Sequence, residues 1–202
     1  MTDVYPFEKI LCTVARWLFN PFILPAYIFI AAVWTNPFCK LYFLLYPKLF
    51  FIILVMDILA VSLIPLIYIQ YSKRQKIDLN EREILILYLI INLINILLFN
   101  KIFSSAVFIP LKTSLIITAL TAATAIAVSF VTDINLHCTT VGLILMIAFK
   151  MFTNSFVAIS IALLLTGIVF SLYLVNGKTN IKQEAAGLVT GFCSVELYSL
   201  FV

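Results

Sequence analysis

Long uncharged apolar stretches dominate this sequence. One of them lies between Arg16 and Lys40, and it is long enough for a helix that crosses a bilayer. Such a helix needs about 20 apolar residues, because each residue advances about 1.5 Å and the hydrocarbon core is about 30 Å thick. The 202-residue chain is 64% hydrophobic and only 11% charged, whereas soluble domains are roughly half apolar and a quarter charged. These features exclude a soluble globule and a disordered chain, and they indicate an integral membrane protein.

The positions of the charged residues divide the chain into seven apolar segments. The predicted fold class is therefore all-α: a polytopic helical membrane bundle of about seven transmembrane helices, with six as the alternative, in a single domain over residues 1–202. The segment 136–149 is short for a crossing, although a locally thinner bilayer would accommodate it. The expected helices are 17–34, 49–70, 84–99, 113–132, 136–149, 156–175 and 185–202.

Prolines and small residues predict how these helices bend and pack. Pro21 and Pro25 should kink the first helix near its start, and Pro65 should bend the second. Residues 35–48 are expected to form a loop, and residues 100–112 a connector in the membrane interface. Small residues recur every four positions in the fourth helix, and Gly187 and Gly191 form a GxxxG pattern in the seventh. Both patterns are typical of close helix packing.

The distribution of basic residues predicts the orientation. Seven crossings would place the N-terminus and the loops 71–83, 133–135 and 176–183 on one side, and the loops 35–48, 100–112 and 150–155 on the other. The first side holds eight of the 13 Lys and Arg residues and the second holds five. Because basic loops stay inside, we expect the first side to be cytoplasmic.

The loops on the first side concentrate the polar residues of the chain. Basic groups near a bilayer attract anionic headgroups by about 1 kcal/mol each. Two interpretations stay open: these residues bind a phosphorylated lipid, or they only fix the topology. No metal, cofactor or nucleic-acid site is expected, because the four cysteines are isolated and the basic residues do not alternate with aromatic residues. The polar residues concerned are Lys73, Arg74, Lys76, Arg82, Asp133, Asn135, His137, Lys178, Lys182 and Gln183.

Several local strings carry a family resemblance. They are Asn20-Pro21-Phe22-Ile23-Leu24-Pro25-Ala26-Tyr27, Ile64-Pro65-Leu66, Leu79-Asn80-Glu81-Arg82-Glu83, Ile134-Asn135-Leu136-His137 with Gly142, Ser171-Leu172-Tyr173-Leu174, and Gln183-Glu184-Ala185-Ala186-Gly187 with Gly191. In this order they resemble the type 2 phosphatidic acid phosphatase superfamily, particularly its short bacterial members. The resemblance covers most of the chain. It implies a multi-pass lipid phosphatase scaffold in the bacterial inner membrane that needs no metal.

In that family three motifs build one phosphate site. They supply a Lys and Arg cradle, a Ser-Gly-His whose His is the general acid, and a Ser-Arg segment that ends in a nucleophilic His. The resemblance assigns the cradle to Lys76 and Arg82, and the general acid to His137. The nucleophile's position falls on Lys178 or Thr179. These motifs are degenerate here, because Asn135-Leu136 replaces Ser-Gly and Leu172 replaces the Arg of the third motif.

The chain contains one His, so a two-histidine phosphoryl transfer cannot run. A Lys amine is protonated at neutral pH, and Lys178 is therefore expected to bind phosphate rather than attack it. We expect a phosphatase-like scaffold that has lost its family's reaction and binds a phosphorylated lipid or polyprenyl headgroup. His137 remains the residual catalytic candidate, or a helix-start residue satisfied by the backbone or by Asp133. The expected phosphate-binding residues are Arg74, Lys76, Arg82, Asn135, Lys178 and Lys182.

Two other functions stay open. The first is an active lipid phosphatase with a rearranged site. The second is a small membrane transporter that uses Asp57 and Glu196, because charged residues within hydrocarbon are costly and are often functional. Asn92 and Asn95 would belong to the same path, or they would serve as hydrogen-bonding glue between helices.

Overall fold

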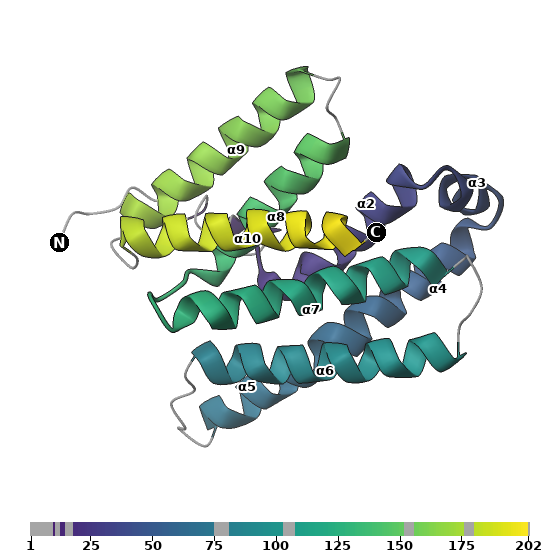
Figure 1. The fold of residues 1–202 in the computed structure, drawn as a ribbon, viewed down its shortest axis with the longest axis horizontal. Coiled ribbons are helices and arrows are strands. Elements are labelled where there is room, and N and C mark those ends of the chain that lie inside the picture. Colours follow the sequence, from purple (N-terminus) through teal and green to yellow (C-terminus); the bar gives the residue numbers. More distant parts are fainter. Residues whose placement is uncertain are drawn as a thin grey trace.

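The computed structural model describes residues 10, 13–14, 18–74, 81–102, 108–151, 156–175 and 180–201. Almost all of these residues lie in helices (Figure 1), which confirms the all-α prediction. The elements are the 3₁₀ turn η1 (Pro21–Ile23), α2 (Leu24–Thr35), α3 (Pro37–Leu45), α4 (Pro47–Ile58), the π-helical turn η2 (Leu59–Leu63), α5 (Ile64–Arg74), α6 (Glu81–Ile102), α7 (Ile109–Ser129), α8 (Leu136–Met151), α9 (Phe156–Val175) and α10 (Ile181–Phe201).

The predicted loop 35–48 is the clearest error of the sequence prediction, because it contains the helix α3. The side chain of Asn36 accepts hydrogen bonds from the backbone N–H groups of Phe38 and Cys39 at 3.0 and 3.3 Å. Pro37 occupies the first helical position, where its missing N–H is harmless. The chain turns by 100° between α2 and α3. A capped helix therefore replaces the expected loop.

A π-helical turn interrupts the second predicted helix. Pro65 has no N–H, and in a regular helix its ring would clash with the carbonyl of Val61. The wider π-helical turn η2 ends two residues before Pro65 and includes Val61. The predicted irregularity at Pro65 therefore takes the form of the π-helical turn just before it. The predicted kink at Pro21 and Pro25 likewise takes the form of η1, which precedes α2.

The predicted seven crossings are not confirmed. Among the described residues, three helices are long and apolar enough to cross a membrane: Pro47–Ser72, Arg82–Lys101 and Ile109–Ser129. A fourth crossing results if the bent pair Pro21–Thr35 and Pro37–Leu45 counts as one. Leu136–Lys150 is apolar but shorter, in agreement with its expected shortness. α9 has the bounds predicted for the sixth helix.

Helix α7 is the centre of the bundle. It packs against α2, α4, α6 and α10, while α8 packs against α10 and α9 packs against α8. Figure 1 places the beginnings of α6, α8 and α10 and the end of α7 at one end of the bundle, and α3 with the C-terminus at the other. This arrangement agrees with the predicted grouping of the loops into two sets.

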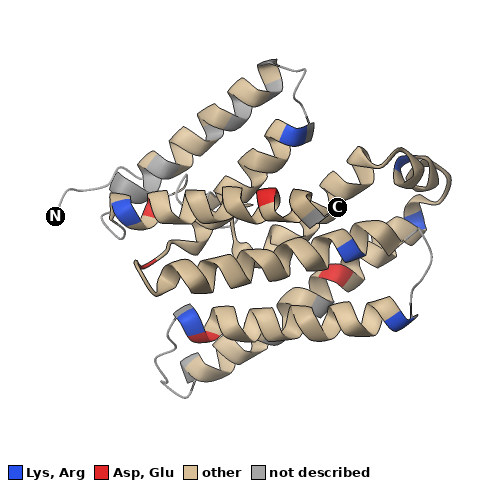
Figure 2. Cartoon of the chain, viewed as in Figure 1, with Lys and Arg blue, Asp and Glu red and all other residues tan. Residues whose placement is uncertain are grey.

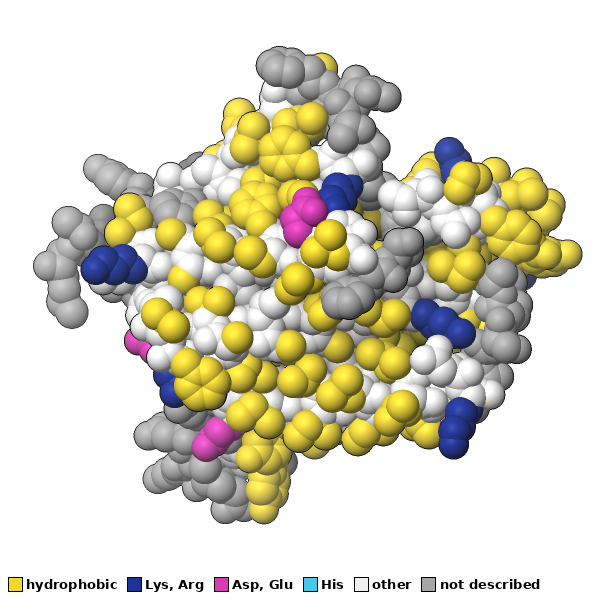
Figure 3. Space-filling view, viewed as in Figure 1, with side chains coloured by type: hydrophobic (Ala, Val, Ile, Leu, Met, Phe, Trp, Pro, Cys, Tyr) yellow, Lys and Arg dark blue, Asp and Glu magenta, His cyan; other side chains and the backbone are white. Residues whose placement is uncertain are grey.

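The bundle has an apolar surface and a partly polar interior. Exposed leucines, isoleucines and phenylalanines cover the helices (Figure 3), and the described Lys and Arg residues lie mainly near the helix ends (Figure 2). Inside, Ser114 and Thr118 of α7 are fully buried. Thr118 donates to the Asn92 side chain at 2.7 Å, and Ser114 donates to the Pro25 carbonyl at 3.1 Å. This distribution is that of a helical bundle whose solvent is lipid.

Candidate functional site

The candidate site lies at the end of the bundle where α6, α8 and α10 begin. Its base is a glycine seam, which we define as Gly142, Gly187 and Gly191, between α8 and α10. A Cβ added to Gly187 would lie 2.6 Å from the Asn135 carbonyl oxygen. Added to Gly191, it would overlap the Thr139 carbonyl. The two helices therefore touch backbone to backbone, which confirms the packing role predicted for the GxxxG pattern.

Asn135 fixes the start of α8. Its side-chain oxygen accepts a hydrogen bond from the backbone N–H of His137 at 3.0 Å, as a helix N-cap does. Its own backbone N–H donates to the Gln183 carbonyl in the first turn of α10, at 3.3 Å. Its side-chain Nδ2 is buried and has no hydrogen-bond partner among the described residues. Asn135 thus joins the starts of α8 and α10 and presents a buried donor between them.

His137 is tied to the chain segment that precedes η1. Its Nδ1 lies 3.0 Å from the carbonyl oxygen of Phe19. A carbonyl only accepts, so Nδ1 carries the hydrogen of this bond. The imidazole is half-buried. Of the two structural partners considered for His137, the backbone is the one found, and it belongs to a residue 118 positions away.

Arg82 connects the start of α6 to the end of α7. Its guanidinium donates a hydrogen bond to the carbonyl of Ser129, the last residue of α7, and lies over the Phe130 ring at 5.4 Å. A cation at the C-terminus of a helix meets unpaired carbonyls and the negative end of the helix dipole. Arg82 therefore has a structural role at this end of the bundle.

The other predicted phosphate-binding residues are only partly described. Lys182 is exposed in the first turn of α10. Arg74 ends α5, but its side chain lies outside the described residues. Lys76 and Lys178 lie wholly outside them. The structure thus brings together the helix starts that carry Arg82, Asn135, His137 and Lys182, and leaves the remaining three side chains undescribed.

Glu184 is the residue that the sequence prediction misplaced. The predicted last helix begins at residue 185, just after Glu184, but Glu184 lies in the first turn of α10 with a fully buried side chain. Its environment includes Cys138 of α8. A carboxylate is favourable at a helix N-terminus. The burial of Glu184 could have been predicted from the sequence. Positions 184, 187 and 191 share one face of a helix, and the two glycines indicate that this face is packed against another helix.

A small cavity lies beneath this end of the bundle. Its volume is about 40 Å³, enough for only a few water molecules. It is bounded by η1, α6, α7 and α8 and is lined by residues that include Phe22, Leu85, Ala125 and Leu136. The lining is almost wholly apolar, so the cavity supplies no polar route into the bundle. Any chemistry at this end must take place at its surface.

The electrostatics at this end are mixed. Arg82 and Lys182 contribute positive charge, and so do the N-termini of α8 and α10 through their unpaired N–H groups. Glu83, Asp133 and Glu184 oppose them, and the Gln183 side chain donates to Asp133 at 3.4 Å. The described residues hold no group of three His, Cys, Asp or Glu side chains that would bind a metal ion. Cationic and anionic groups therefore lie together at this end.

A second polar site lies inside the bundle at Asp57 of α4. Its side chain is 0% exposed, and neither carboxylate oxygen has a hydrogen-bond partner among the described residues. Ser114 of α7 and Tyr88 of α6 are its polar neighbours, and the Ser114 hydroxyl lies close enough to interact with it although it donates to the Pro25 carbonyl. The π-helical turn η2 starts two residues later, and such turns are frequent at functional sites.

Two of the residues grouped with Asp57 in the transporter hypothesis, Glu196 and Asn92, have other polar partners. Glu196 is exposed and forms an ion pair with Lys150 of α8 at 3.3 Å. Asn92 is buried, donates to the Tyr88 carbonyl at 2.8 Å and accepts from Thr118. Asn92 therefore serves as interhelical glue, and Glu196 ties α10 to α8.

Comparisons of this chain with protein-family models, with curated proteins and with solved structures gave no match.

Proposed function

We propose that this integral membrane protein binds the phosphorylated headgroup of a lipid at the end of the bundle where α6, α8 and α10 begin. One observation carries the proposal: each of these helix starts is hydrogen-bonded to a segment distant in the sequence, and the starts of α8 and α10 are bonded to each other. Arg82 bonds Ser129, Asn135 bonds Gln183, and His137 bonds Phe19. The buried Nδ2 of Asn135 supports the proposal, because this donor has no partner among the described residues and a phosphate oxygen could accept its hydrogen bond.

Phosphate is the ligand chemistry that this end fits best. Two helix N-termini, an amide donor and exposed Lys182 all favour an anion. The carboxylates of Asp133 and Glu184 reduce the attraction. We therefore expect modest affinity, which depends on the lipid tails being held in the same bilayer.

We propose binding without turnover. The chain has one imidazole, and the Nδ1 of His137 is engaged by a backbone carbonyl. Phosphoryl transfer of the family type requires a nucleophile and a separate general acid. The resemblance to type 2 phosphatidic acid phosphatases would then reflect a shared scaffold rather than a shared reaction.

Binding to vesicles tests this function. The purified protein is captured on phosphatidylcholine vesicles with or without phosphatidic acid, and on vesicles carrying a polyprenyl phosphate. We expect a preference for phosphorylated lipid that falls about fivefold in Lys182→Gln, the loss of about 1 kcal/mol. Lys101→Gln is the matched control, because Lys101 is an exposed lysine at the other end of the bundle. Equal capture on neutral and phosphorylated vesicles would refute the proposal.

The same preparation separates binding from catalysis. We expect no phosphate release from either phosphorylated lipid by the unaltered chain. Release that disappears in His137→Ala would establish the active phosphatase instead.

Asp57 favours a second candidate function, the movement of a small cation across the membrane. Its buried carboxylate has no hydrogen-bond partner among the described residues and lies beside a π-helical turn. Ionisable groups in such positions commonly belong to proton or ion pathways. Flux of protons or sodium into proteoliposomes should stop in Asp57→Asn and persist in Glu196→Gln. Flux that survives Asp57→Asn would end this candidate.

A further inference from the structure

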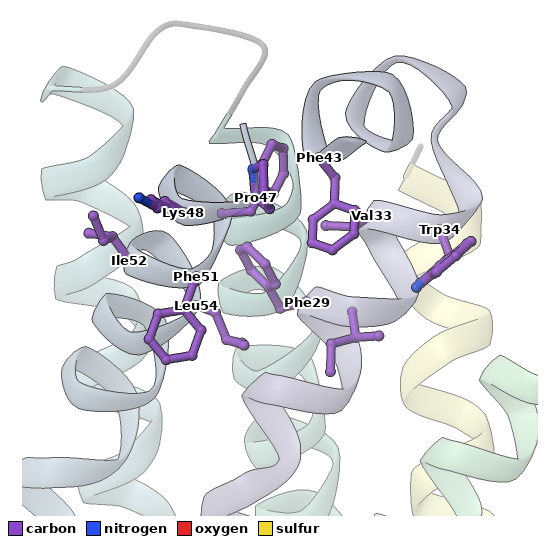
Figure 4. Close-up of a pocket in the computed structure, with 11 residues that line it drawn as sticks. Phe29, Val33, Trp34, Phe43, Pro47, Lys48, Phe51, Ile52 and Leu54 are labelled. Carbon is purple, nitrogen blue, oxygen red and sulfur yellow. The ribbon is translucent and has the colours of Figure 1, made fainter. Parts of the chain in front are cut away.

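An apolar groove lies between α2 and α4, at the opposite end of the bundle from the candidate site (Figure 4). Its volume is about 690 Å³, within the range of pockets that hold small molecules. Buried Phe29, Val33 and Phe50 form its floor. Phe50 makes edge-to-face contacts with Phe29 and Phe43, with ring centroids 6.4 and 5.9 Å apart. These ring contacts hold the aromatic side chains of the floor in place, so the groove is formed by the packing of α2, α3 and α4.

The walls of the groove are open to the surroundings. Ile30 and Trp34 of α2 are exposed on one side, and Phe51 and Ile52 of α4 are exposed on the other. The 100° bend after α2 brings α3 across the groove, where Figure 4 shows Phe43 reaching from α3 toward Val33. The groove is therefore apolar, accessible from the side and bounded by α3 at one end. That shape suits a single hydrocarbon chain.

Lysines lie on opposite sides of the groove, because Figure 4 shows Lys48 on the side away from Trp34, the residue that Lys40 contacts. Lys48 in the first turn of α4 lines the groove. Lys40 of α3 holds its ammonium group 4.9 Å from the centre of the Trp34 ring, a cation–π contact. No Asp or Glu is among the residues that line the groove. The charge is thus complementary to a phosphate group at the head of an acyl chain.

We propose that this groove binds an anionic phospholipid, with one acyl chain along the aromatic floor and the phosphate near Lys48. The lipid lies in the leaflet opposite the candidate headgroup site. The inference does not depend on the proposed function, because the two sites share no residue.

Quenching of Trp34 fluorescence by brominated lipids tests the proposal. Trp17→Phe leaves Trp34 as the single tryptophan. The protein is reconstituted in phosphatidylcholine with rising fractions of brominated phosphatidylglycerol or brominated phosphatidylcholine. We expect half-maximal quenching at a mole fraction of the anionic lipid about fivefold lower than that of the neutral lipid. Equal mole fractions for the two lipids would overturn the proposal.

Two pairs of variants locate the effect. Lys48→Gln should remove most of the preference, whereas Lys101→Gln, at the same end of the bundle, should keep it. Ile30→Phe on the groove wall should weaken quenching by both lipids, and Ile94→Phe on the exposed face of α6 should not. Equal losses in both members of a pair would refute the site.

Lys182→Gln should leave the Trp34 response unchanged, so this site and the headgroup site can fail independently. Weak quenching by both lipids, with Trp34 cross-linked to a second copy, would show that protein fills the groove.

Discussion

Two polar residues inside the bundle show how differently a buried polar side chain can be accommodated. Asn92 uses its amide to donate to Tyr88 and its oxygen to accept from Thr118. Asp57 is equally buried, but neither of its oxygens meets a hydrogen-bond donor among the described residues. A satisfied polar group adds specificity to helix packing, whereas an unsatisfied carboxylate destabilises the fold.

Asp57 should therefore be replaceable with a gain in stability. We expect Asp57→Leu to raise the free energy of unfolding by about 1–3 kcal/mol, because it removes a buried polar group that lacks a partner. Thermal unfolding in detergent, followed by intrinsic fluorescence, measures the change. Asp133→Asn, at an exposed position, is the control and should shift the melting temperature little. A large loss of stability in Asp57→Leu would assign the carboxylate a structural partner.

His137 marks the limit of sequence reasoning at this scale. Its position at the start of a helix was predicted correctly, and so was a backbone partner as one option. The identity of that partner depends on how residues 18–20 lie against α8. A tertiary contact over 118 residues leaves no local pattern in the sequence.

At the scale of helices, the glycine seam is the contact most sensitive to mutation. We expect Gly191→Ala to destabilise the protein by about 1–3 kcal/mol or more, because the added methyl group would overlap the backbone of α8. Gly167→Ala in α9 is the matched control, since a Cβ there has no neighbour within 4 Å. Thermal unfolding of the two variants makes the comparison. Equal melting temperatures would mean that α8 and α10 pack differently.

Helix positions were largely predictable, and the exceptions have local causes. Apolar stretches bounded by charges gave the bounds of α9 and the approximate bounds of α6, α7 and α8. α3 was missed because Asn36-Pro37 was taken as a loop, although the same pair is a good N-cap and first helical residue. The π-helical turn before Pro65 depends on how the strain of that proline is relieved, which hydropathy does not report.

For the whole molecule, the grouping of helix ends predicts which residues share a side of the membrane. Asp133 and Lys101 are exposed at opposite ends of the bundle. In a background without the natural cysteines, Asp133→Cys and Lys101→Cys should react with an impermeant maleimide from opposite sides. The excess of basic residues predicts that Asp133→Cys is labelled from the cytoplasm. Labelling of both positions from one side would contradict a membrane crossing by α7, the helix that lies between them in the chain.

The sequence also predicted the membrane class of the protein, but not the number of crossings. Hydropathy counts apolar stretches one by one. It does not distinguish a straight crossing from the bent pair α2 and α3, or a crossing from the short α8. That distinction depends on tertiary packing, here the bend at Asn36-Pro37 and the contact of α8 with α10.

The glycine seam has a consequence for the history of this protein. At these glycines the backbone of one helix contacts the backbone of the other. A larger residue therefore cannot be accommodated by a smaller neighbouring side chain, because the contacting atoms belong to the backbone. Diversification is then confined to the outward faces of α8 and α10 and to their ends. Descendants of this chain could change their ligands freely, yet they would inherit the spacing of these two helices unchanged.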